Sequence, residues 1–384
     1  MRIGINLLYL LPGIVGGTET YASSLLHGLA LIDKQNDYFV FVNRESAEWP
    51  LPDVPNFRRV VCAVQAINRT KRYLFEQLIL PFLAHSYKLQ LMHSLGYVAP
   101  VLLPCKVVVS ILDIIYDYPG SFARRQLLKL FMEMSVRRAD SILTISENSK
   151  KQIAAHLHVS PEKIAVTYLA PKVRKVSPDV SWEDFKIRWD LDDLYLLALS
   201  SLSPSKNIPR LLAALAILNN ELPENLKLVL AGHIPCKGAS LKRLVDSLDL
   251  GKRVIFTGYL PDEELVLLLQ HATVFVFPSL YEGFGIPVLE AMAAGVPVAC
   301  SNAASLPEVA GEAALLFDPL AVDEIAMTIR RLINEPNLRA ELARRGYQNV
   351  ARFSWKTTAE KTLQVYEILI RSKKHVGIIK EGDS

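Results

Sequence analysis

Two glutamates flank a glycine-containing turn in FPSLYEGFGIPVLEAMAAGVP, residues 277–297. Glu282 comes before the turn, and Glu290 lies about one turn inside a helix whose start is favoured by Pro287. A carboxylate near the positive end of a helix is electrostatically favoured, so both groups could point into one space as acceptors for a hydroxyl-rich ligand. The alternative is a helix-terminal glutamate beside an unrelated loop glutamate. The backbone amides expected to face the ligand are those of Phe284, Gly285 and Ile286.

Two other loops could contact a phosphate group. In PGIVGGTETYA, Gly16 and Gly17 precede a helix whose free N–H groups favour an anion. In SPSKNIPRLL, Lys206 supplies a compact positive charge beside Asn207. An ordinary glycine turn and a solvated lysine are the competing interpretations. The glycine spacing is not G-x-G-x-x-G, which disfavours a nicotinamide cofactor.

Short apolar runs that could position these loops alternate with segments of helical period. Strands alternating with helices predict parallel sheets, and their near-continuous apolar character predicts helices on both faces. Ligands of such sheets bind beyond the carboxyl ends of the strands, where the loops above begin. The runs are RIGINLLYL, DYFVFVN, KVVVSILD, SILTIS and KIAVTYL in the first half, and YLLALSS, KLVLAG, VIFTG, TVFVFPS and VPVACS in the second.

The 384 residues exceed the usual size of a single core, so two doubly wound α/β domains are expected. Residues 170–191 contain prolines and mixed charges between two strand runs, as a linker does. The predicted parts are an N-terminal domain, a linker, a C-terminal domain, and a final amphipathic helix with a tail. Their ranges are 1–172, 173–190, 191–354 and 355–384.

The composition excludes several classes of protein. The net charge of +4 is too small, and the basic residues too scattered, for a dedicated nucleic-acid binder. The four cysteines form no C-x-x-C pair, so neither a zinc site nor a disulfide framework is predicted, and free thiols fit a reducing cytoplasm. No metal motif of D-x-D type follows a strand, and no apolar run reaches the roughly 20 residues of a spanning helix.

The segment at 277–297 resembles the E-x7-E signature of retaining family-4 glycosyltransferases, also called glycosyl transferases group 1, which have the GT-B fold. The resemblance extends in order through further segments and covers Ile3 to about Arg371. These segments are GIVGGTETYA, ADSILTISENSKKQI, PSKNIPRLL, LVLAG, VIFTGYLPDEELVLLLQHATVFVFPS and FSWKTTAEKTLQVYEIL.

The resemblance implies two Rossmann-like domains that face each other across a cleft, with the final helix crossing back to the N-terminal domain. It implies retaining, metal-independent transfer of a hexose, with mannose a candidate, from a nucleotide sugar to a glycan or lipid-linked acceptor, without a cofactor. The setting is assembly of cell-surface polysaccharide at the inner face of the cytoplasmic membrane. Glu290 would bind the ribose, Glu282 would face the donor sugar and Lys206 would neutralise the diphosphate. Gly16, Gly17, Asn207, Phe284, Gly285 and Ile286 would complete the donor site.

The chain departs from the family pattern at the acceptor side. In SILDII, Leu112 stands where the family often has a histidine, and only Asp113 of that pair remains as a catalytic candidate. His93 follows another strand and is an acceptor-site candidate, with a packed histidine as the alternative. Serines precede Lys206 where many members have an arginine. A catalytically silent nucleotide-sugar-binding or scaffold protein therefore stays open as a second function.

Residues 122–138, FARRQLLKLFMEMSVRR, mix basic and apolar side chains. This pattern is typical of a helix that lies on an anionic membrane surface. It also fits a crossover helix that packs its apolar face on the sheet.

Overall fold

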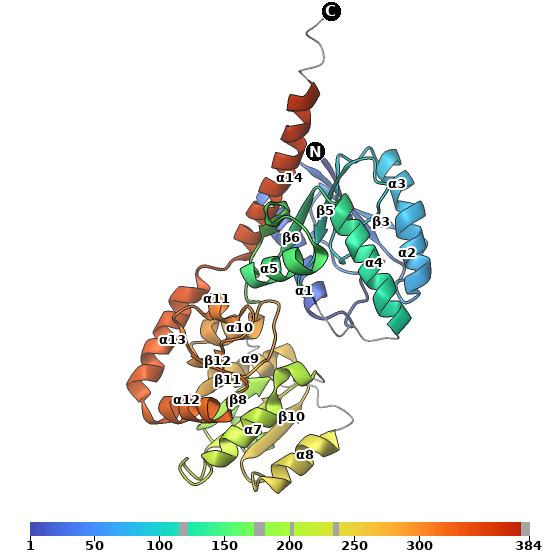
Figure 1. Ribbon diagram of the computed structural model, residues 1–384. Coiled ribbons are helices and arrows are strands. Elements are labelled where there is room, and N and C mark those ends of the chain that lie inside the picture. Colours follow the sequence, from blue (N-terminus) through green and yellow to red (C-terminus); the bar gives the residue numbers. More distant parts are fainter. Residues whose placement is uncertain (115–121, 173–180, 200–202, 233–237, 378–384) are drawn as a thin grey trace, which may run out of the picture. The chain divides into compact units, whose positions relative to one another are not determined.

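The computed structural model describes residues 1–114, 122–172, 181–199, 203–232 and 238–377, and the chain divides into two compact units (Figure 1). Unit 1 contains Met1–Leu169 and Ser354–Ser384, and unit 2 contains Ala170–Phe353. None of the helices in the described ranges is both long and apolar enough to cross a bilayer.

Unit 1 is built on a seven-stranded sheet in the order β3-β2-β1-β4-β5-β6-β7, in which every neighbouring pair is parallel. Its strands are β1 Arg2–Asn6, β2 Asp37–Val42, β3 Phe57–Val61, β4 Leu91–Ser94, β5 Lys106–Ser110, β6 Ser141–Thr144 and β7 Ile164–Val166. Its helices are α1 Gly17–Ile32, α2 Arg69–Leu78, α3 Leu80–Ser86, α4 Phe122–Arg138, α5 Glu147–Leu157, the 3-10 turn η1 Pro161–Lys163 and α14 Trp355–Gly377.

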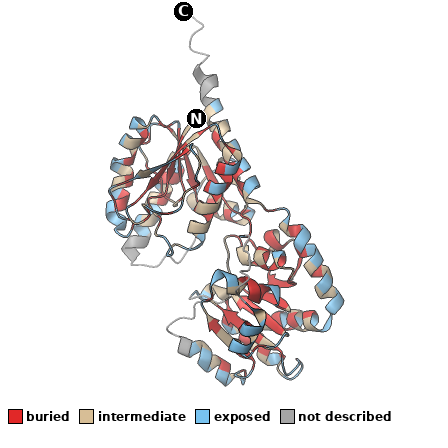
Figure 2. Cartoon of the chain, turned by 180° about the vertical axis from the view of Figure 1, so that it is seen from behind, coloured by how far each residue is buried: buried red, intermediate tan, exposed pale blue. Residues whose placement is uncertain are grey.

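The central strands of unit 1 are buried because helices cover both faces of the sheet, as the red strands in Figure 2 show. Asn6 is in register with Ser94, and Ser94 with Val109, so β1, β4 and β5 end at one edge. The loops that follow these three strands therefore meet there, which is the edge where ligands of parallel sheets bind.

The last helix, α14, belongs to unit 1 although nearly two hundred residues separate it from the rest of that unit. It packs on α1, and Gly28 makes the close approach possible, because a Cβ atom there would lie 2.7 Å from the carbonyl oxygen of Trp355. Thr358 Oγ1 donates a hydrogen bond of 2.5 Å to the carbonyl oxygen of Tyr168. These contacts join α14 to α1 and to the segment that follows β7.

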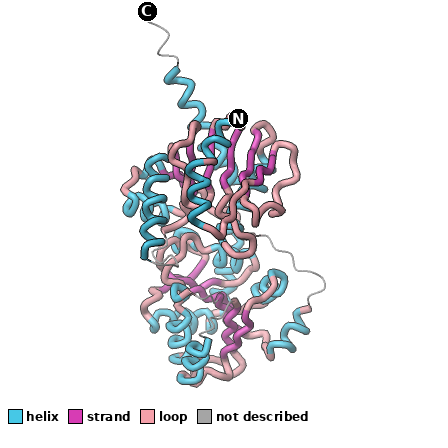
Figure 3. The backbone as a smooth tube through the Cα atoms, turned by 90° about the vertical axis from the view of Figure 1, so that its right-hand side faces the viewer, coloured by secondary structure: helices cyan, strands magenta, loops and turns pink. Residues whose placement is uncertain are grey.

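Unit 2 is built on a six-stranded sheet in the order β10-β9-β8-β11-β12-β13, again parallel throughout. The strands of both sheets are magenta in Figure 3. Its strands are β8 Tyr195–Leu199, β9 Lys227–Ala231, β10 Val254–Gly258, β11 Val274–Phe277, β12 Val298–Ser301 and β13 Ala314–Phe317. Its helices are α6 Trp182–Trp189, η2 Pro204–Lys206, α7 Ile208–Ile217, α8 Gly238–Ser247, α9 Asp262–Gln270, α10 Ile286–Ala293, α11 Leu306–Ala310, α12 Val322–Asn334 and α13 Pro336–Val350.

The two sheets confirm the predicted fold class of two Rossmann-like, doubly wound parallel-sheet units. Part of the segment predicted as a linker forms the helix α6, in which Trp182 stacks on His271 with ring centroids 4.1 Å apart. Both residues lie in unit 2, so α6 packs as part of that unit. Residues 173–180 of the predicted linker lie outside the described residues.

Candidate functional site

Lys206 and Glu282, both predicted catalytic residues, form an ion pair at the carboxyl edge of the unit 2 sheet. Lys206 Nζ lies 2.6 Å from Glu282 Oε1, and their side chains are 19% and 18% exposed. The lysine follows β8 and the glutamate follows β11, which is the neighbouring strand. Lys206 Nζ also lies 4.7 Å from the centre of the Phe277 ring. The sheet therefore brings together two charges that are 76 residues apart in the sequence.

The loops that carry this pair are fastened to each other. The amide of Leu280 donates a 2.7 Å hydrogen bond to the carbonyl of Ser205. Asn207 has a left-handed backbone with φ of 57° and is only 3% exposed. Its Nδ2 donates to the carbonyl oxygens of Pro278 and Pro319, at 3.1 and 2.7 Å. The Asn207 side chain thus holds these loops together, and its donor contact stays a prediction.

The turn between the two glutamates is hydrogen-bonded to Ser305, the N-cap residue of α11. Ser305 Oγ lies 2.9 Å from the carbonyl oxygen of Glu282 and 2.8 Å from that of Phe284. The Phe284 ring is buried and meets Phe353 edge-on at 5.7 Å. Gly285, the N-cap of α10, has φ of 110°, and no side chain caps the helix there. The first amides of α10 therefore start at an uncapped turn, which suits an anion or a polar ligand.

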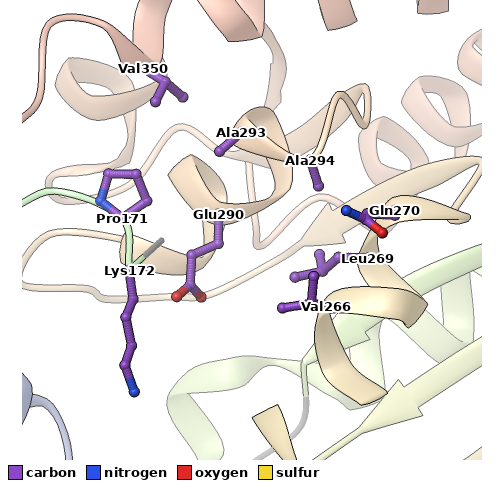
Figure 4. Close-up of a pocket in the computed structure, with 9 residues that line it drawn as sticks. All are labelled: Pro171, Lys172, Val266, Leu269, Gln270, Glu290, Ala293, Ala294 and Val350. Carbon is purple, nitrogen blue, oxygen red and sulfur yellow. The ribbon is translucent and has the colours of Figure 1, made fainter. Parts of the chain in front are cut away.

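Glu290 borders a pocket of about 310 Å³ in unit 2 (Figure 4). Lys172, at the pocket's edge, pairs with Asp262 at 3.0 Å. The other walls are mainly aliphatic, so the pocket offers one carboxylate beside an apolar surface. A sugar with vicinal hydroxyls that carries a flat base would fit this combination. The lining residues are Pro171, Lys172, Val266, Leu269, Gln270, Glu290, Ala293, Ala294 and Val350.

In unit 1 the predicted glycine loop is open to close approach. Gly16 is the N-cap of α1 with φ of 57°, and a Cβ atom at Gly16 or Gly17 would meet no heavy atom within 4 Å. Glu19, in the first turn of α1, faces back into the protein, where its two carboxylate oxygens accept from the Gly13 amide at 2.8 Å and from Trp49 Nε1 at 3.0 Å. The Glu19 carboxylate thus holds the loop at Gly13, and the backbone at Gly16 and Gly17 stays open to a ligand.

His93 is fully buried in β4, and both ring nitrogens are paired. Nδ1 lies 2.6 Å from the hydroxyl of Tyr366 on α14, and Nε2 lies 2.7 Å from Ser110 Oγ at the end of β5. The hydroxyl of Tyr21 on α1 lies 2.8 Å from the same serine oxygen. Burial lowers the pKa of His93 to about 3, which keeps the ring neutral. This geometry matches the packed histidine that the sequence left as the alternative to an acceptor contact.

Asp113 lies just beyond β5 and is half-buried. Its Oδ1 accepts a 2.9 Å hydrogen bond from the hydroxyl of Tyr97, in the loop after β4. Leu112 beside it is 5% exposed and packs into the core. Sequence reasoning identified Asp113 but not Tyr97, since a tyrosine in a loop carries no signal of its partner.

No cluster of three or more His, Cys, Asp or Glu side chains in the described ranges is arranged to hold a metal ion. The charges that the described structure offers to a ligand are those of side chains and helix termini.

Two known families match the chain in succession. Residues 15–170 match Glycosyltransferase Family 4, and residues 180–349 match Glycosyl transferases group 1. The second match contains Lys206, Glu282 and Glu290, and the first contains Gly16, Gly17, His93 and Asp113.

Among curated proteins, the chain is 34% identical over 248 residues to the O-antigen chain mannosyltransferase B of Escherichia coli. That match covers 62% of this chain and 64% of the relative, which is less than two thirds of the relative's length. Among solved structures, sucrose-phosphate synthase from Thermosynechococcus elongatus has a TM-score of 0.76 at 20% identity, over 97% of this chain and all of that one. HepE from Anabaena in complex with UDP has a TM-score of 0.73 at 19% identity, over 96% of this chain and all of that one. At these identities the two structures show a shared fold.

Proposed function

Because the chain belongs to the glycosyl transferases group 1, within glycosyltransferase family 4, we propose that it transfers a hexose from a nucleotide sugar to a glycan or lipid-linked acceptor. The observation that carries the proposal is the Lys206–Glu282 ion pair at the carboxyl edge of the unit 2 sheet. The presence of Lys206, Glu282 and Glu290 together favours an enzyme over a silent scaffold protein.

Each charge of the pair has a separate role when the donor binds. Lys206 is assigned to the diphosphate, where an ammonium group stabilises the negative charge that develops on the leaving group. Glu282 is assigned to a hydroxyl of the donor sugar, and Glu290 to the ribose at its pocket. In the absence of donor the ion pair keeps both side chains in place, so little reorganisation is needed on binding.

The proposed step breaks the bond between the anomeric carbon and the diphosphate oxygen. The electron pair of that bond stays on the phosphate. An acceptor oxygen forms the new bond to the anomeric carbon on the same face, and its proton passes to the phosphate oxygen. The product is a glycoside of retained configuration plus a nucleoside diphosphate. No side-chain base is required in this step, which agrees with leucine at position 112.

The names of the similar proteins reduce the number of candidate donors. The Escherichia coli relative is named a mannosyltransferase of O-antigen chains, which supports mannose as the sugar and a cell-surface polysaccharide as the product. The HepE structure is named as a complex with UDP, which supports a nucleoside diphosphate as the leaving group. We propose a mannosyl donor first and a UDP-hexose second.

A thermal-shift series tests the donor directly. A ligand at a hundredfold excess over its dissociation constant stabilises the folded state by about 2.7 kcal/mol. GDP-mannose, UDP-glucose, dTDP-glucose and ADP-glucose would be compared, and one of them should raise the melting temperature. The product of the best donor, followed by NMR at the anomeric proton, should have the donor's configuration. No shift with any donor, or an inverted product, would contradict the proposal.

Peripheral contact with an anionic membrane is proposed for unit 1, and the structure adds α2 and α3 to the helix suggested by the sequence. Large apolar side chains on α2, α3 and α4 are exposed, and Phe82 reaches 75%. Tyr73 of α2 packs on Phe131 of α4 with ring centroids 4.9 Å apart, so these helices are neighbours. Exposed apolar and basic side chains together suit an anionic lipid surface. The apolar set is Leu74, Leu78, Phe82, Leu127 and Leu130, and the basic set is Arg69, Lys71, Lys88, Lys129 and Arg137.

Vesicle sedimentation tests this contact. The wild-type protein should pellet with phosphatidylglycerol vesicles at low salt and stay in solution with phosphatidylcholine alone. Phe82→Ser should weaken pelleting, whereas Leu320→Ser, which changes an apolar residue of unit 2 that is 61% exposed, should not. Equal pelleting of the two variants would count against the surface on α2 to α4.

A further inference from the structure

Tyr97 has an unusual backbone for a large side chain. Its φ is 67°, in the left-handed region that non-glycine residues other than asparagine and aspartate seldom adopt. The residue before it, Gly96, allows the Tyr9 ring to pack against the chain, because a Cβ atom there would lie 2.3 Å from Tyr9 Cδ1. The loop after β4 is therefore held in a costly conformation by its surroundings, as happens often at ligand sites.

This conformation places the Tyr97 hydroxyl on Asp113. The hydroxyl donates to Asp113 Oδ1 at 2.9 Å, and the bond joins the loops that follow the neighbouring strands β4 and β5. Both residues are half-buried at the carboxyl edge of the sheet, so they are reachable from outside. A carboxylate can accept several hydrogen bonds at once, and the bond from Tyr97 fixes its direction.

The buried polar contacts around His93 support the same loop from below. The Tyr97 amide donates to the Ser110 carbonyl at 3.3 Å, and Ser110 Oγ lies 2.7 Å from His93 Nε2. His93 in turn contacts Tyr366 of α14. A continuous set of contacts thus runs from the C-terminal helix to the Tyr97 backbone.

We propose that Tyr97 and Asp113 form a hydroxyl-binding subsite of unit 1, in which Tyr97 positions the Asp113 carboxylate to accept from a hydroxyl of the acceptor glycan. The inference rests on the proposed glycosyl transfer. Leu112 cannot hydrogen-bond a sugar, so a subsite at this edge has to use the next residue. The hydrogen bond from Tyr97 fixes the orientation of the Asp113 carboxylate in that subsite.

Tyr97→Phe removes only the hydroxyl. The loss of a hydrogen bond to a charged group should raise the KM for the acceptor about tenfold or more. Hydrolysis of the nucleotide-sugar donor by water, which needs no acceptor, should stay at the wild-type rate. Tyr87→Phe is the matched control, because Tyr87 is a half-buried tyrosine of unit 1 that packs on Phe39 and Phe41.

Two further variants separate positioning from folding. Asparagine tolerates the left-handed region but cannot replace the packing of the Tyr97 ring on the core, so Tyr97→Asn should fold with a lower melting temperature and lose acceptor affinity. Asp113→Asn should raise the acceptor KM more than Tyr97→Phe does, and the double variant should be no worse than Asp113→Asn alone, because the two residues act as one unit.

The outcomes distinguish this inference from the function on which it rests. An unchanged acceptor KM in Tyr97→Phe would overturn the subsite while leaving glycosyl transfer intact. The same conclusion would follow if the increases in acceptor KM caused by Tyr97→Phe and Asp113→Asn multiplied in the double variant. If the wild-type protein neither transfers nor hydrolyses any donor, the proposed function fails, and binding of methyl α-mannoside by ligand-observed NMR then decides the subsite alone. That binding should weaken in Tyr97→Phe and not in Tyr87→Phe, and equal binding in both would overturn it.

Discussion

Polar side chains near the carboxyl edges of the two sheets differ sharply in burial. Unit 2 keeps Lys206 and Glu282 close to the surface, at 19% and 18% exposure, and fastens the loops around them. Unit 1 buries His93 completely and Glu76 to 2% exposure beneath its edge. Charges left near the surface can meet a ligand, whereas fully buried polar groups mainly fix the shape of the loops above them. We therefore assign donor chemistry to unit 2. In unit 1 the buried groups support the loops that carry the half-buried Tyr97 and Asp113.

The largest expected effect is on the unit 2 pair. Glu282→Gln removes the charge at almost constant shape, so transfer should fall about a hundredfold or more while the protein stays folded. Glu335→Gln is the control, because Glu335 forms an exposed ion pair with Arg331 at 3.0 Å in the same unit. Initial rates of nucleoside diphosphate release would measure both. Similar rates for the two variants would remove the distinction between the pair and an ordinary surface ion pair.

The next effect is the pH dependence of stability in unit 1. The pKa of His93 is lowered by burial to about 3 in the folded chain, from an ordinary value of 6.5. Below pH 6.5 the unfolded chain binds a proton that the folded one does not, so His93 should make stability fall as the pH drops from 6.5 toward 3. Urea unfolding at several pH values should show a flatter dependence in His93→Gln. The control His27→Gln, at an exposed histidine on α1 of the same unit, should keep most of the wild-type slope.

Glu76 should give the free energy of unfolding a pH dependence opposite in sign to that of His93. Burial raises its pKa to about 7 from 4.5, although Arg72 and Asn6 lower it in part. Between pH 4.5 and 7 the folded chain then binds the extra proton, so stability from this group falls as the pH rises through that range. The Glu76→Gln variant should lose this decline between pH 5 and pH 8. An unchanged slope would mean that the buried carboxyl is charged at neutral pH.

The smallest expected effects are changes in the free energy of unfolding when one glycine of each unit is replaced by alanine. Gly285→Ala places a Cβ 2.6 Å from Leu306 Cδ2 at φ of 110°, so the free energy of unfolding should fall by about 1–3 kcal/mol. Gly17→Ala meets nothing within 4 Å at the start of α1, so stability should not fall. If the glycine loop contacts the diphosphate, Gly17→Ala should instead raise the KM for the donor. A stability loss at Gly17 larger than at Gly285 would contradict the accessible loop described for unit 1.

The sequence was sufficient for features that depend on local pattern. Apolar runs alternating with helical segments predicted both parallel sheets, and Pro287 with its neighbouring glycines predicted the turn before α10. It was not sufficient for partners brought together by folding. Tyr97 meets Asp113 across 16 residues, and His93 meets Tyr366 across 273, with no local signal at either end. The sequence also carried no sign that the amide of Asn207 donates to the carbonyls of Pro278 and Pro319.

The most direct test of the account is nucleoside diphosphate release from the best-binding donor, with acceptor present, by the wild-type protein and by Lys206→Ala. Lys186→Ala is the matched control, because Lys186 pairs with Asp193 at 3.0 Å on the surface of the same unit. The wild type and Lys186→Ala should release the diphosphate at similar rates, and Lys206→Ala should be slower by about a hundredfold or more. Near-normal release by Lys206→Ala would contradict the assignment of donor chemistry to the Lys206–Glu282 pair.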